Sequence, residues 1–309
     1  MNTTDNPGLW TVVLAGGDGV RLRQLTRALH GEELPKQFAL IHGGTSLLQA
    51  TVARAKRWSA PERIVVVVAH EREALARAQL RDYGPVHLAV QPCNRGTGPG
   101  VLLPLSHVLA MDPSAHVVIL PSDHYVRDEA PFEQSIRAAI AASEEQIALI
   151  GAVPDHAETQ YGWMVRGVRP DVEGHVVECF CEKPPANVAQ QLLRDGALWN
   201  TFVMAGSVQR FWSLASQHLP QQASRFETYL TALNGPEERM ALRALYARMP
   251  VADFSRDVLE RARDLRLVPL RTCGWSDWGT PERVLHSLRN HSDYGVLSRR
   301  LALTAAAAG

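Results

Sequence analysis

The organising segment of this chain reads Thr11-Val12-Val13-Leu14-Ala15-Gly16-Gly17-Asp18-Gly19-Val20-Arg21-Leu22 and closes at Pro35-Lys36-Gln37-Phe38. Its apolar start predicts a buried strand. The three glycines after the strand let the backbone approach a ligand and point several N–H groups at it, which suits a polyphosphate. Arg21 follows the glycines, and a basic arm brings Lys36 back to the same place. Two cations would therefore face the spread negative charge of a phosphoryl-transfer transition state.

The glycines alone do not identify a nucleotide site, because Gly-Gly also forms ordinary tight turns. The G-x-x-x-x-G-K-[ST] spacing of a P-loop is absent, and the G-x-G-x-x-G pattern of a dinucleotide-binding loop fails after Gly19. The combination with Arg21-Leu22 and Pro35-Lys36-Gln37-Phe38 is more specific. It resembles the N-terminal signature of the sugar-1-phosphate nucleotidylyltransferases, and most closely that of the mannose-1-phosphate guanylyltransferases.

The composition is typical of a soluble enzyme and weighs against two other classes of protein. The chain has 309 residues, of which 46% are hydrophobic and 21% charged, as expected for one large domain. Its 32 basic and 32 acidic residues give no net charge, which argues against a nucleic-acid partner. No apolar run approaches the roughly 20 residues that span a bilayer, and residues 1–7 lack the pattern of a signal peptide. We therefore expect a cytoplasmic protein without a membrane partner, whose four cysteines are reduced structural thiols.

Strand and helix patterns alternate through the first half of the chain. Strands are predicted over 64–68, 86–90, 117–120 and 147–153, and helices over 45–57, 71–81, 101–110 and 131–142. The continuous apolar run Ile64–Val68 is typical of a strand buried on both faces. We expect an α/β fold with a Rossmann-like, doubly wound, mixed but mainly parallel sheet. The resemblance implies the GT-A-like fold of nucleotide-diphospho-sugar transferases.

The pattern changes after residue 154, where strands are predicted over 161–168, 175–180, 201–205 and 265–270. Helices are predicted over 207–217, 222–233, 237–247, 256–263 and 281–290. Because no repeat or long linker is visible, residues 1–290 are expected to form one catalytic domain with a small inserted β/α portion that binds the sugar. Residues 291–309 are expected to be a helical or frayed tail. Ligands of open α/β sheets bind at the carboxyl ends of strands, so the loops after Ala15, Val90, Leu120 and Phe180 should converge on one cleft.

Two acidic motifs are candidates for a metal site. Pro121-Ser122-Asp123-His124 follows a buried strand, where an aspartate can hold a hard cation but also commonly caps a helix or forms a turn. Trp275-Ser276-Asp277-Trp278-Gly279 precedes the last predicted helix, where an aspartate in a turn is equally common. The two motifs are similar to the P-S-D-H and W-S-D-x-G motifs of the family, whose aspartates bind magnesium. The resemblance implies that Asp123 and Asp277 share one Mg²⁺ with the substrate phosphates.

A further pair of motifs is similar to the sugar-binding motifs of the family. Glu182-Lys183-Pro184 ends a predicted strand, where a Lys-Pro pair is most often a solvated loop. In the family this motif supplies a sugar-hydroxyl acceptor and a phosphate-binding lysine, so the resemblance gives those roles to Glu182 and Lys183. The stretch Glu158–Gly162 resembles the family's E-T-G-Y-G. The sugar-binding residues implied are Tyr161, Gly162, Glu182 and Asn200.

The loop Gln91–Pro99 is either a plain strand-to-helix connection capped by Thr97 or part of a nucleotide site. It is similar to the family's P-x-x-R-N-T-A-P, with Gly96 and Gly98 in place of Asn and Ala. The nucleotide-binding residues implied are Leu14, Ala15, Gly16, Gly17, Gly19, Gln91, Arg95, Thr97 and Ser122.

Four further positions depart from the family pattern. Val20 stands in place of a frequent Thr or Ser, Gln24 in place of a common Pro, and Ser255 in place of an Asp. Phe202 replaces a glycine, so a bulky ring is expected to shrink or reshape the sugar pocket.

The motifs together imply that a nucleoside triphosphate and a sugar 1-phosphate give an NDP-sugar and pyrophosphate, with GTP and mannose 1-phosphate favoured. The attacking phosphate is largely ionised near pH 7, since its second pKa is about 6, so no general base is needed. Catalysis would depend on alignment and on three cations: Arg21, Lys36 and Lys183. A homodimer is the candidate assembly. Three alternatives stay open: a thymidylyl- or uridylyltransferase, a GT-A-like glycosyltransferase, for which the usual D-x-D motif is absent, and a non-catalytic sugar-nucleotide-binding regulator.

Overall fold

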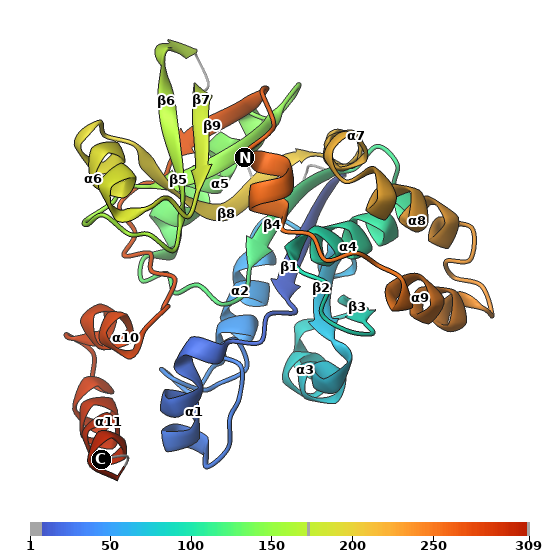
Figure 1. Ribbon diagram of the computed structural model, residues 1–309. Helices are drawn as coiled ribbons and strands as arrows, with labels where there is room; N and C mark the ends of the chain where they lie inside the picture. The colour runs from blue at the N-terminus through green and yellow to red at the C-terminus, as the bar shows by residue number, and fades with distance from the viewer. Residues whose placement is uncertain (1–7, 172–173, 308–309) are drawn as a thin grey trace.

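The computed structural model describes residues 8–171 and 174–307, which form a nine-stranded mixed sheet with helices on both faces (Figure 1). The strands are β1 (Leu9–Ala15), β2 (Ile64–Ala69), β3 (His87–Gln91), β4 (His116–Pro121), β5 (Ile147–Ala152), β6 (Gly162–Asp171), β7 (Gly174–Glu182), β8 (Leu198–Ser207) and β9 (Leu265–Pro269). The helices are α1 (Arg23–His30), α2 (Leu47–Ala55), α3 (Glu73–Leu80), α4 (Thr97–Met111), α5 (Glu129–Ala141), α6 (Ala186–Arg194), α7 (Val208–His218), α8 (Pro220–Leu230), α9 (Glu238–Ala247), α10 (Pro281–Leu288) and α11 (Tyr294–Ala307).

The sheet runs in the order β3-β2-β1-β4-β8-β5-β9-β7-β6, and β8 also pairs with β6. The mixed α/β prediction is confirmed, but the expectation of a mainly parallel sheet is wrong. Among the described strands, four pairings are parallel (β1–β2, β1–β4, β2–β3 and β5–β9) and five are antiparallel. The difference arises because β8 runs antiparallel between β4 and β5, and because β6 and β7 form a hairpin, which needs no helical crossover.

Strand β1 lies at the centre of the parallel half, between β2 and β4. Val12 and Val13 are both fully buried, and they contribute to different hydrophobic clusters, because successive side chains of a strand point to opposite faces. The register pairs Ala15 with Val68 of β2 and Leu14 with Pro121 of β4. The carboxyl ends of these strands therefore meet at one edge, where the glycine turn begins.

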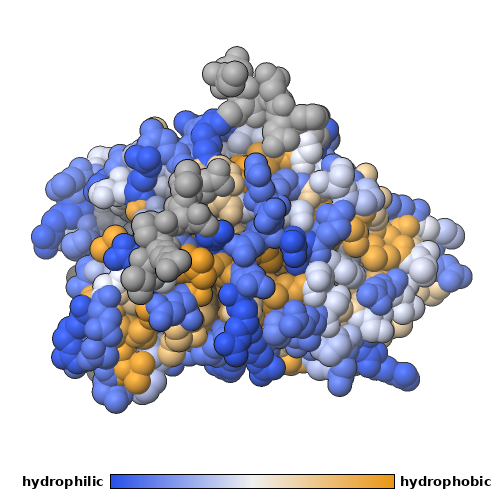
Figure 2. Space-filling view, turned by 90° about the horizontal axis from the view of Figure 1, so that it is seen from above, coloured by the Kyte–Doolittle hydropathy of each residue, from blue (hydrophilic) through white to orange (hydrophobic). Residues whose placement is uncertain are grey.

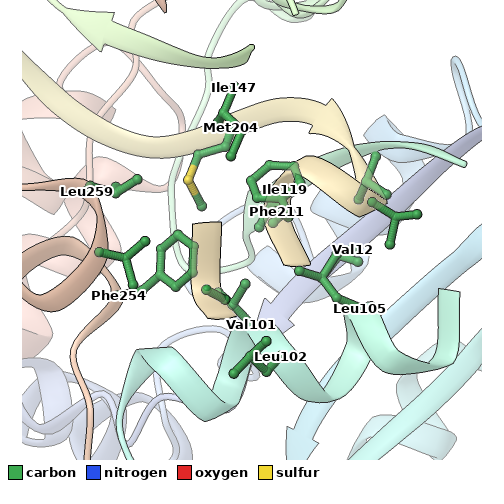
Figure 3. Close-up of a cluster of buried hydrophobic side chains, with 14 of the residues drawn as sticks. Val12, Val101, Leu102, Leu105, Ile119, Ile147, Met204, Phe211, Phe254 and Leu259 are labelled. Carbon is green, nitrogen blue, oxygen red and sulfur yellow. The ribbon is translucent and has the colours of Figure 1, made fainter. Parts of the chain in front are cut away.

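Helices cover both faces of the sheet and leave the core between layers. On one face, helix α4 packs on β1, β2 and β3, and α7 and α8 pack against α4. On the other face, α2 contacts β1, α3 contacts β2 and α5 contacts β5. Figure 3 shows Val101 and Leu105 of α4 near Val12 of β1, with Phe254 closing one side of the same cluster. Each large apolar side chain buried in this way contributes about 1.5–3 kcal/mol.

The segment between the glycine turn and Lys36 differs from the predicted basic arm. It contains a short 3₁₀ turn, Val20–Leu22, followed by α1, which ends at Gly31 in a left-handed C-cap (φ 77°). A third hydrophobic cluster joins this segment to the C-terminal helices: Leu22, Leu25, Val284, Leu288 and Leu297 are buried in it. Helices α10 and α11 thus pack against the segment that carries Arg21.

The structure corrects one further prediction and adds one helix that the sequence patterns missed. Helix α6 was not predicted, and the predicted helix over 256–263 is a short π-helix, Ser255–Leu259. The predicted tail includes α11, and residues 308–309 lie outside the described residues. Within the described ranges no helix is long and apolar enough to cross a bilayer, and the face in Figure 2 is mainly hydrophilic with separate hydrophobic patches.

Candidate active site

The glycine turn after β1 borders a cavity of ≈ 360 Å³, here called the first cavity. The loops after β1, β3 and β4 all contribute to its wall, as does Phe202 of β8. Three of the four loops that the sequence predicts in one cleft therefore converge, whereas the loop after Phe180 contributes none of its described residues to this wall. The wall includes Leu14, Gly16, Gly17, Gly19, Gln37, Gln91, Asn94, Gly96, Thr97, Asp123, His124 and Phe202.

The turn is held closely against the segment that carries Lys36. The side-chain amide of Gln37 donates hydrogen bonds to the carbonyls of Ala15 (3.1 Å) and Gly17 (2.7 Å). Gly19 has φ 57°, and a Cβ there would lie 2.8 Å from the backbone nitrogen of Lys36. A side chain at Gly19 would therefore push these two segments apart.

Lys36 connects the two predicted aspartates. Its side chain is buried, and Nζ lies 3.1 Å from Oδ2 of Asp123 and donates a hydrogen bond to the backbone carbonyl of Asp277. Arg21 Nη2 lies 3.5 Å from Oδ2 of Asp277. The structure thus brings together four of the predicted residues from three distant parts of the sequence.

The charges of this cluster follow from its surroundings. Desolvation is the largest single influence on the pKa of Asp123 and raises it, but the charge of Lys36, the nearby His124 and the hydrogen bonds to the carboxylate together outweigh it, so the pKa lies below its usual value. Burial lowers the pKa of His124 despite the nearby Asp123, so its imidazole is neutral near pH 7. Its Nδ1 accepts a hydrogen bond from Nε1 of Trp275 (3.3 Å). Asp123 is therefore an anion, and His124 is a neutral neighbour.

Arg283 of α10 is a site residue that the sequence did not reveal. Its Nη1 donates to Oδ1 of Asp277 (2.9 Å), its Nη2 pairs with Glu158, and its guanidinium lies over the ring of Tyr161, 5.0 Å from the centroid. An arginine in the first turn of an amphipathic helix looks like a solvated residue. Only its position after the Trp275–Gly279 motif could have drawn attention to it.

Asp277 and Arg283 also border a second cavity of ≈ 470 Å³. Aromatic side chains form much of its wall, among them Tyr161, Trp199 and Trp275. The rings of Tyr161 and Trp199 meet edge to face, with centroids 5.1 Å apart. This second cavity has the aromatic and charged lining that a sugar phosphate requires.

Glu182 and Lys183 line neither of these cavities. The backbone nitrogen of Lys183 donates to the carbonyl of Tyr161 (3.1 Å), and its Nζ lies 3.4 Å from Oε1 of Glu182. A Cβ on Gly162 would lie 2.7 Å from Oε2 of Glu182, so Gly162 gives room to this carboxylate. Burial raises the pKa of Glu182, with Lys183 opposing that shift. Glu182 is the last residue of β7 and Lys183 follows it, so the structure places both residues next to Tyr161 and Gly162 rather than in the Lys36 cluster.

The chain from residue 10 to 293 matches the family model described as nucleotidyl transferase. This protein belongs to the nucleotidyl transferase family. It is 31% identical over 282 residues to the xanthan biosynthesis protein XanB of Xanthomonas campestris pv. campestris, and 28% identical over 283 residues to the mannose-1-phosphate guanylyltransferase of Escherichia coli. These alignments cover 89% and 88% of this chain but 58% of each relative. The chain therefore spans little more than half the length of these curated relatives.

A solved structure agrees with this assignment. The protein from Thermus thermophilus described as mannose-1-phosphate geranyltransferase superposes with a TM-score of 0.81 at 30% identity. The match covers 91% of this chain and 79% of that chain. The mixed sheet is thus the nucleotide-diphospho-sugar transferase fold.

The loop around Thr97 is not the plain connection capped by Thr97, which was one of the two interpretations that the sequence left open. Gly96 is the N-cap residue of α4, with φ 84°, and Thr97 is the first helical residue. Its hydroxyl accepts a hydrogen bond from the backbone nitrogen of Phe254 (2.7 Å). A Cβ on Gly96 would lie 2.3 Å from the carbonyl of Ala252, which explains the glycine at this position. Thr97 still lines the first cavity.

Other predicted nucleotide and sugar residues form contacts within the protein. Ser122 donates from both its nitrogen and its hydroxyl to the carbonyl of Leu14, at 3.0 and 2.8 Å. Arg95 Nε donates to the carbonyl of Tyr246 (3.2 Å). Oδ1 of Asn200 accepts from the backbone nitrogen of Phe202 (3.0 Å). The side chains of Ser122, Arg95 and Asn200 thus hold the backbone around the first cavity in place.

Three of the four described non-glycine residues with a positive φ lie in the site or next to it, and the fourth, Asn234, follows α8. Lys183, Phe202 and Trp278 have φ values of 50°, 57° and 45°, in the left-handed region that favours glycine. Each such conformation costs about 1–3 kcal/mol, which the surrounding structure must supply. Phe202 occupies the position where the sequence pattern of the family has glycine, and its ring meets Phe254 edge to face, 6.2 Å between centroids.

Proposed function

We propose that this chain transfers a nucleotidyl group from an NTP to a sugar 1-phosphate, giving an NDP-sugar and pyrophosphate, with GTP and mannose 1-phosphate as the substrates. The observation that carries the proposal is the buried ammonium of Lys36, which contacts Asp123 on one side and Asp277 on the other. The names of the mannose-1-phosphate guanylyltransferase relatives support the choice of substrates.

The two substrates would bind in the two cavities on either side of Lys36. Asp123 lines the first cavity, with the glycine turn, and Asp277 lines the second, with the aromatic wall. The nucleotide would occupy the first cavity and the sugar the second. The α-phosphate and the sugar phosphate would then meet beside Lys36, in the position that an in-line attack requires.

The proposed mechanism relies on charge neutralisation rather than on a general base. A sugar-phosphate oxygen attacks the α-phosphorus as pyrophosphate leaves, and this oxygen is ionised near pH 7 because its second pKa is about 6. Lys36 is held by a carboxylate and a carbonyl, so its charge is already oriented before reaction. Arg21 would stabilise the α-phosphate and the leaving group. Because Lys183 lines neither cavity, its partly exposed ammonium would act on the sugar phosphate only as this substrate approaches the second cavity.

Magnesium is part of the proposal, and the donor set is compatible with it. Within the described residues no group of three or more His, Cys, Asp or Glu side chains is arranged so that it could hold a metal ion, so protein ligands would be limited to Asp123 and Asp277. Oδ1 of Asp123 lies 3.8 Å from His124 and Oδ2 of Asp277 lies 3.5 Å from Arg21, so each carboxylate has an oxygen held by a long contact. Two hard oxygens completed by phosphates and water suit Mg²⁺, which would neutralise charge on the phosphates.

The test is a matrix of five NTPs against several sugar 1-phosphates, with Mg²⁺ present. Pyrophosphate release and chromatography of the NDP-sugar would be measured together. We expect the highest kcat/KM for GTP with mannose 1-phosphate. Preference for dTTP or UTP would replace the substrates and keep the reaction, whereas binding of sugar nucleotides without turnover would support a regulator. We also propose that the chain forms a homodimer, which light scattering would test by measuring its mass in solution. The proposed location is the cytoplasm.

A further inference from the structure

A third cavity of ≈ 720 Å³ lies between β3, an edge strand of the sheet, and α9. It shares no lining residue with the first two cavities. Figure 1 shows α9 close to the β3 end of the sheet, away from the β6–β7 hairpin. One part of the wall is apolar and includes Leu88, Val90, Pro92 and Leu242, and another part carries Arg239 and Arg243. We call it the β3–α9 cavity.

The charge that this cavity offers to a ligand is positive. Arg239 and Arg243 are exposed and stand four residues apart on α9, so they lie on the same face of the helix. Within the described residues neither arginine forms an ion pair. Of the two carboxylates in the wall, Glu73 is paired with Arg77 (2.8 Å), whereas Glu238 keeps its charge because it accepts from the neutral hydroxyl of Tyr229 (2.9 Å). The two arginines therefore outnumber the one carboxylate of this wall that has no cationic partner in the described part of the chain. Two guanidinium groups beside an apolar wall suit an organic anion.

The cavity is connected to the nucleotide side of the protein through Tyr246. This buried residue lines the β3–α9 cavity, and its hydroxyl donates to Oε1 of Gln91 (3.3 Å) while its carbonyl accepts from Arg95 (3.2 Å). Gln91 lines the first cavity, and Cys93 of the same loop lines the β3–α9 cavity. The loop after β3 therefore has one cavity on each side.

We propose that the β3–α9 cavity binds a small organic anion, with a phosphate group at Arg239 and Arg243 and an apolar or aromatic body against Leu88, Val90 and Leu242. Its occupation changes the affinity of the first cavity through Tyr246 and the loop after β3. The binding itself is independent of the enzymatic reaction, whereas the coupling rests on the proposed function. By linkage, the nucleotide must change the affinity for the anion by the same factor.

Binding is tested with Cys93 as the reporter. The probe is 1-naphthyl phosphate, 1-naphthol is its uncharged control, and the rate of Cys93 alkylation by iodoacetamide is read by mass spectrometry. The exposed Cys179 is the internal reference, because it lies on β7. We expect 1-naphthyl phosphate to slow alkylation of Cys93 but not of Cys179, 1-naphthol to protect much less, and the double variant R239Q/R243Q to lose the protection.

Two outcomes would overturn the binding proposal. Equal protection in R239Q/R243Q would place the probe elsewhere, for example in the first cavity. Slower alkylation at higher protein concentration, together with a dimer that R239Q/R243Q dissociates, would make the cavity an interface between two copies of the chain.

Coupling is tested by the dissociation constant of GTP with and without saturating 1-naphthyl phosphate. We expect a change of about fivefold or more in the wild type, none in R239Q/R243Q, and a smaller one in Tyr246→Phe, which lacks the hydroxyl that contacts Gln91. Protection of Cys93 without a change in GTP affinity would overturn the coupling alone. Failure of GTP to bind at all would instead count against the proposed function, and the result for Cys93 would still stand.

Discussion

At the scale of single residues, Lys36 links the two cavities. A buried ammonium is stable only when it is paired, and here Asp123 supplies the charge and the carbonyl of Asp277 fixes the direction. Arg21 differs, because its side chain is 57% exposed and contacts Asp277 at 3.5 Å. The folded state therefore depends on Lys36, whereas Arg21 is available to a ligand.

Replacing Arg21 by alanine should separate catalysis from stability. We expect kcat to fall by about 10²–10³, because one preorganised cation is lost from the transition state. The urea midpoint should change little, since an exposed ion pair contributes at most about 1 kcal/mol. Arg23→Ala is the matched control, because Arg23 is also exposed but pairs with Glu33, which follows α1, and not with Asp277. Near-normal turnover of Arg21→Ala would remove Arg21 from the mechanism.

Phe202 combines a bulky side chain with a backbone conformation that favours glycine. Its φ of 57° suits glycine, and its ring narrows the first cavity rather than the second one, where the sequence led us to expect it. Phe202→Gly should leave stability within about 1 kcal/mol of wild type, because relief of strain offsets lost packing. The KM for GTP should rise, and bulkier nucleotide analogues should become substrates. An unchanged nucleotide profile would contradict this role.

At the scale of elements, α10 joins the two halves of the site. Arg283 is the third residue of this helix, which Pro281 starts and whose N-cap Thr280 accepts a hydrogen bond from the nitrogen of Arg283. The helix start thus fixes the backbone from which the guanidinium reaches Asp277 and Glu158.

Arg283→Met should raise the KM for the sugar 1-phosphate and lower stability by about 2 kcal/mol, since Asp277 and Glu158 lose a shared partner. Arg283→Lys keeps the charge but cannot contact Asp277 and Glu158 with two separate nitrogens. It should therefore recover only part of the lost stability and substrate affinity. A double-mutant cycle with Glu158→Gln, read by urea unfolding, should show strong non-additivity. Additive effects would mean that the pair does not act as a unit.

The end of β7 gives a pH-dependent prediction. Burial raises the pKa of Glu182 in the folded state above its unfolded value, so the folded protein binds more protons and stability falls as pH rises through this window. Glu182→Gln should therefore be more stable than wild type above the raised pKa, and the advantage should disappear below the unfolded pKa. Urea unfolding from acidic to neutral pH measures the difference. A difference that does not depend on pH would contradict the assignment.

Sequence reasoning predicted the strands that are continuous apolar runs. It missed elements whose position depends on contacts with segments far away in the sequence. Strands β1, β2, β4 and β5 are apolar runs buried on both faces, so their existence was predictable. Helices α1 and α6 are short and amphipathic, and only two residues of each are buried. The central place of β8 depends on pairing with β4 and β5, which no local pattern records. In the site, motifs located Lys36, Asp123 and Asp277 but not Arg283.

At the scale of the whole molecule, the C-terminal helices support the segment that carries Arg21. Leu297 of α11 is 2% exposed and belongs to the cluster of Leu22 and Leu25. Leu297→Ala should lower stability by about 2–4 kcal/mol and also lower kcat, because the cavity it creates loosens the turn before α1. Val296→Ala is the matched control, as Val296 is 49% exposed. Loss of stability without any loss of kcat would show that α11 only stabilises the fold.

Strand β8 carries one wall residue of each cavity, Trp199 and Phe202, only three positions apart. At about 3.3 Å per residue, these two positions are separated by no more than about 10 Å. Since β8 is hydrogen-bonded to neighbours on both sides, a hinge between a nucleotide half and a sugar half would have to tear a continuous sheet. Under the proposed binding, a single strand sets the spacing of the two reactants, and the continuity of the sheet opposes a hinge between them.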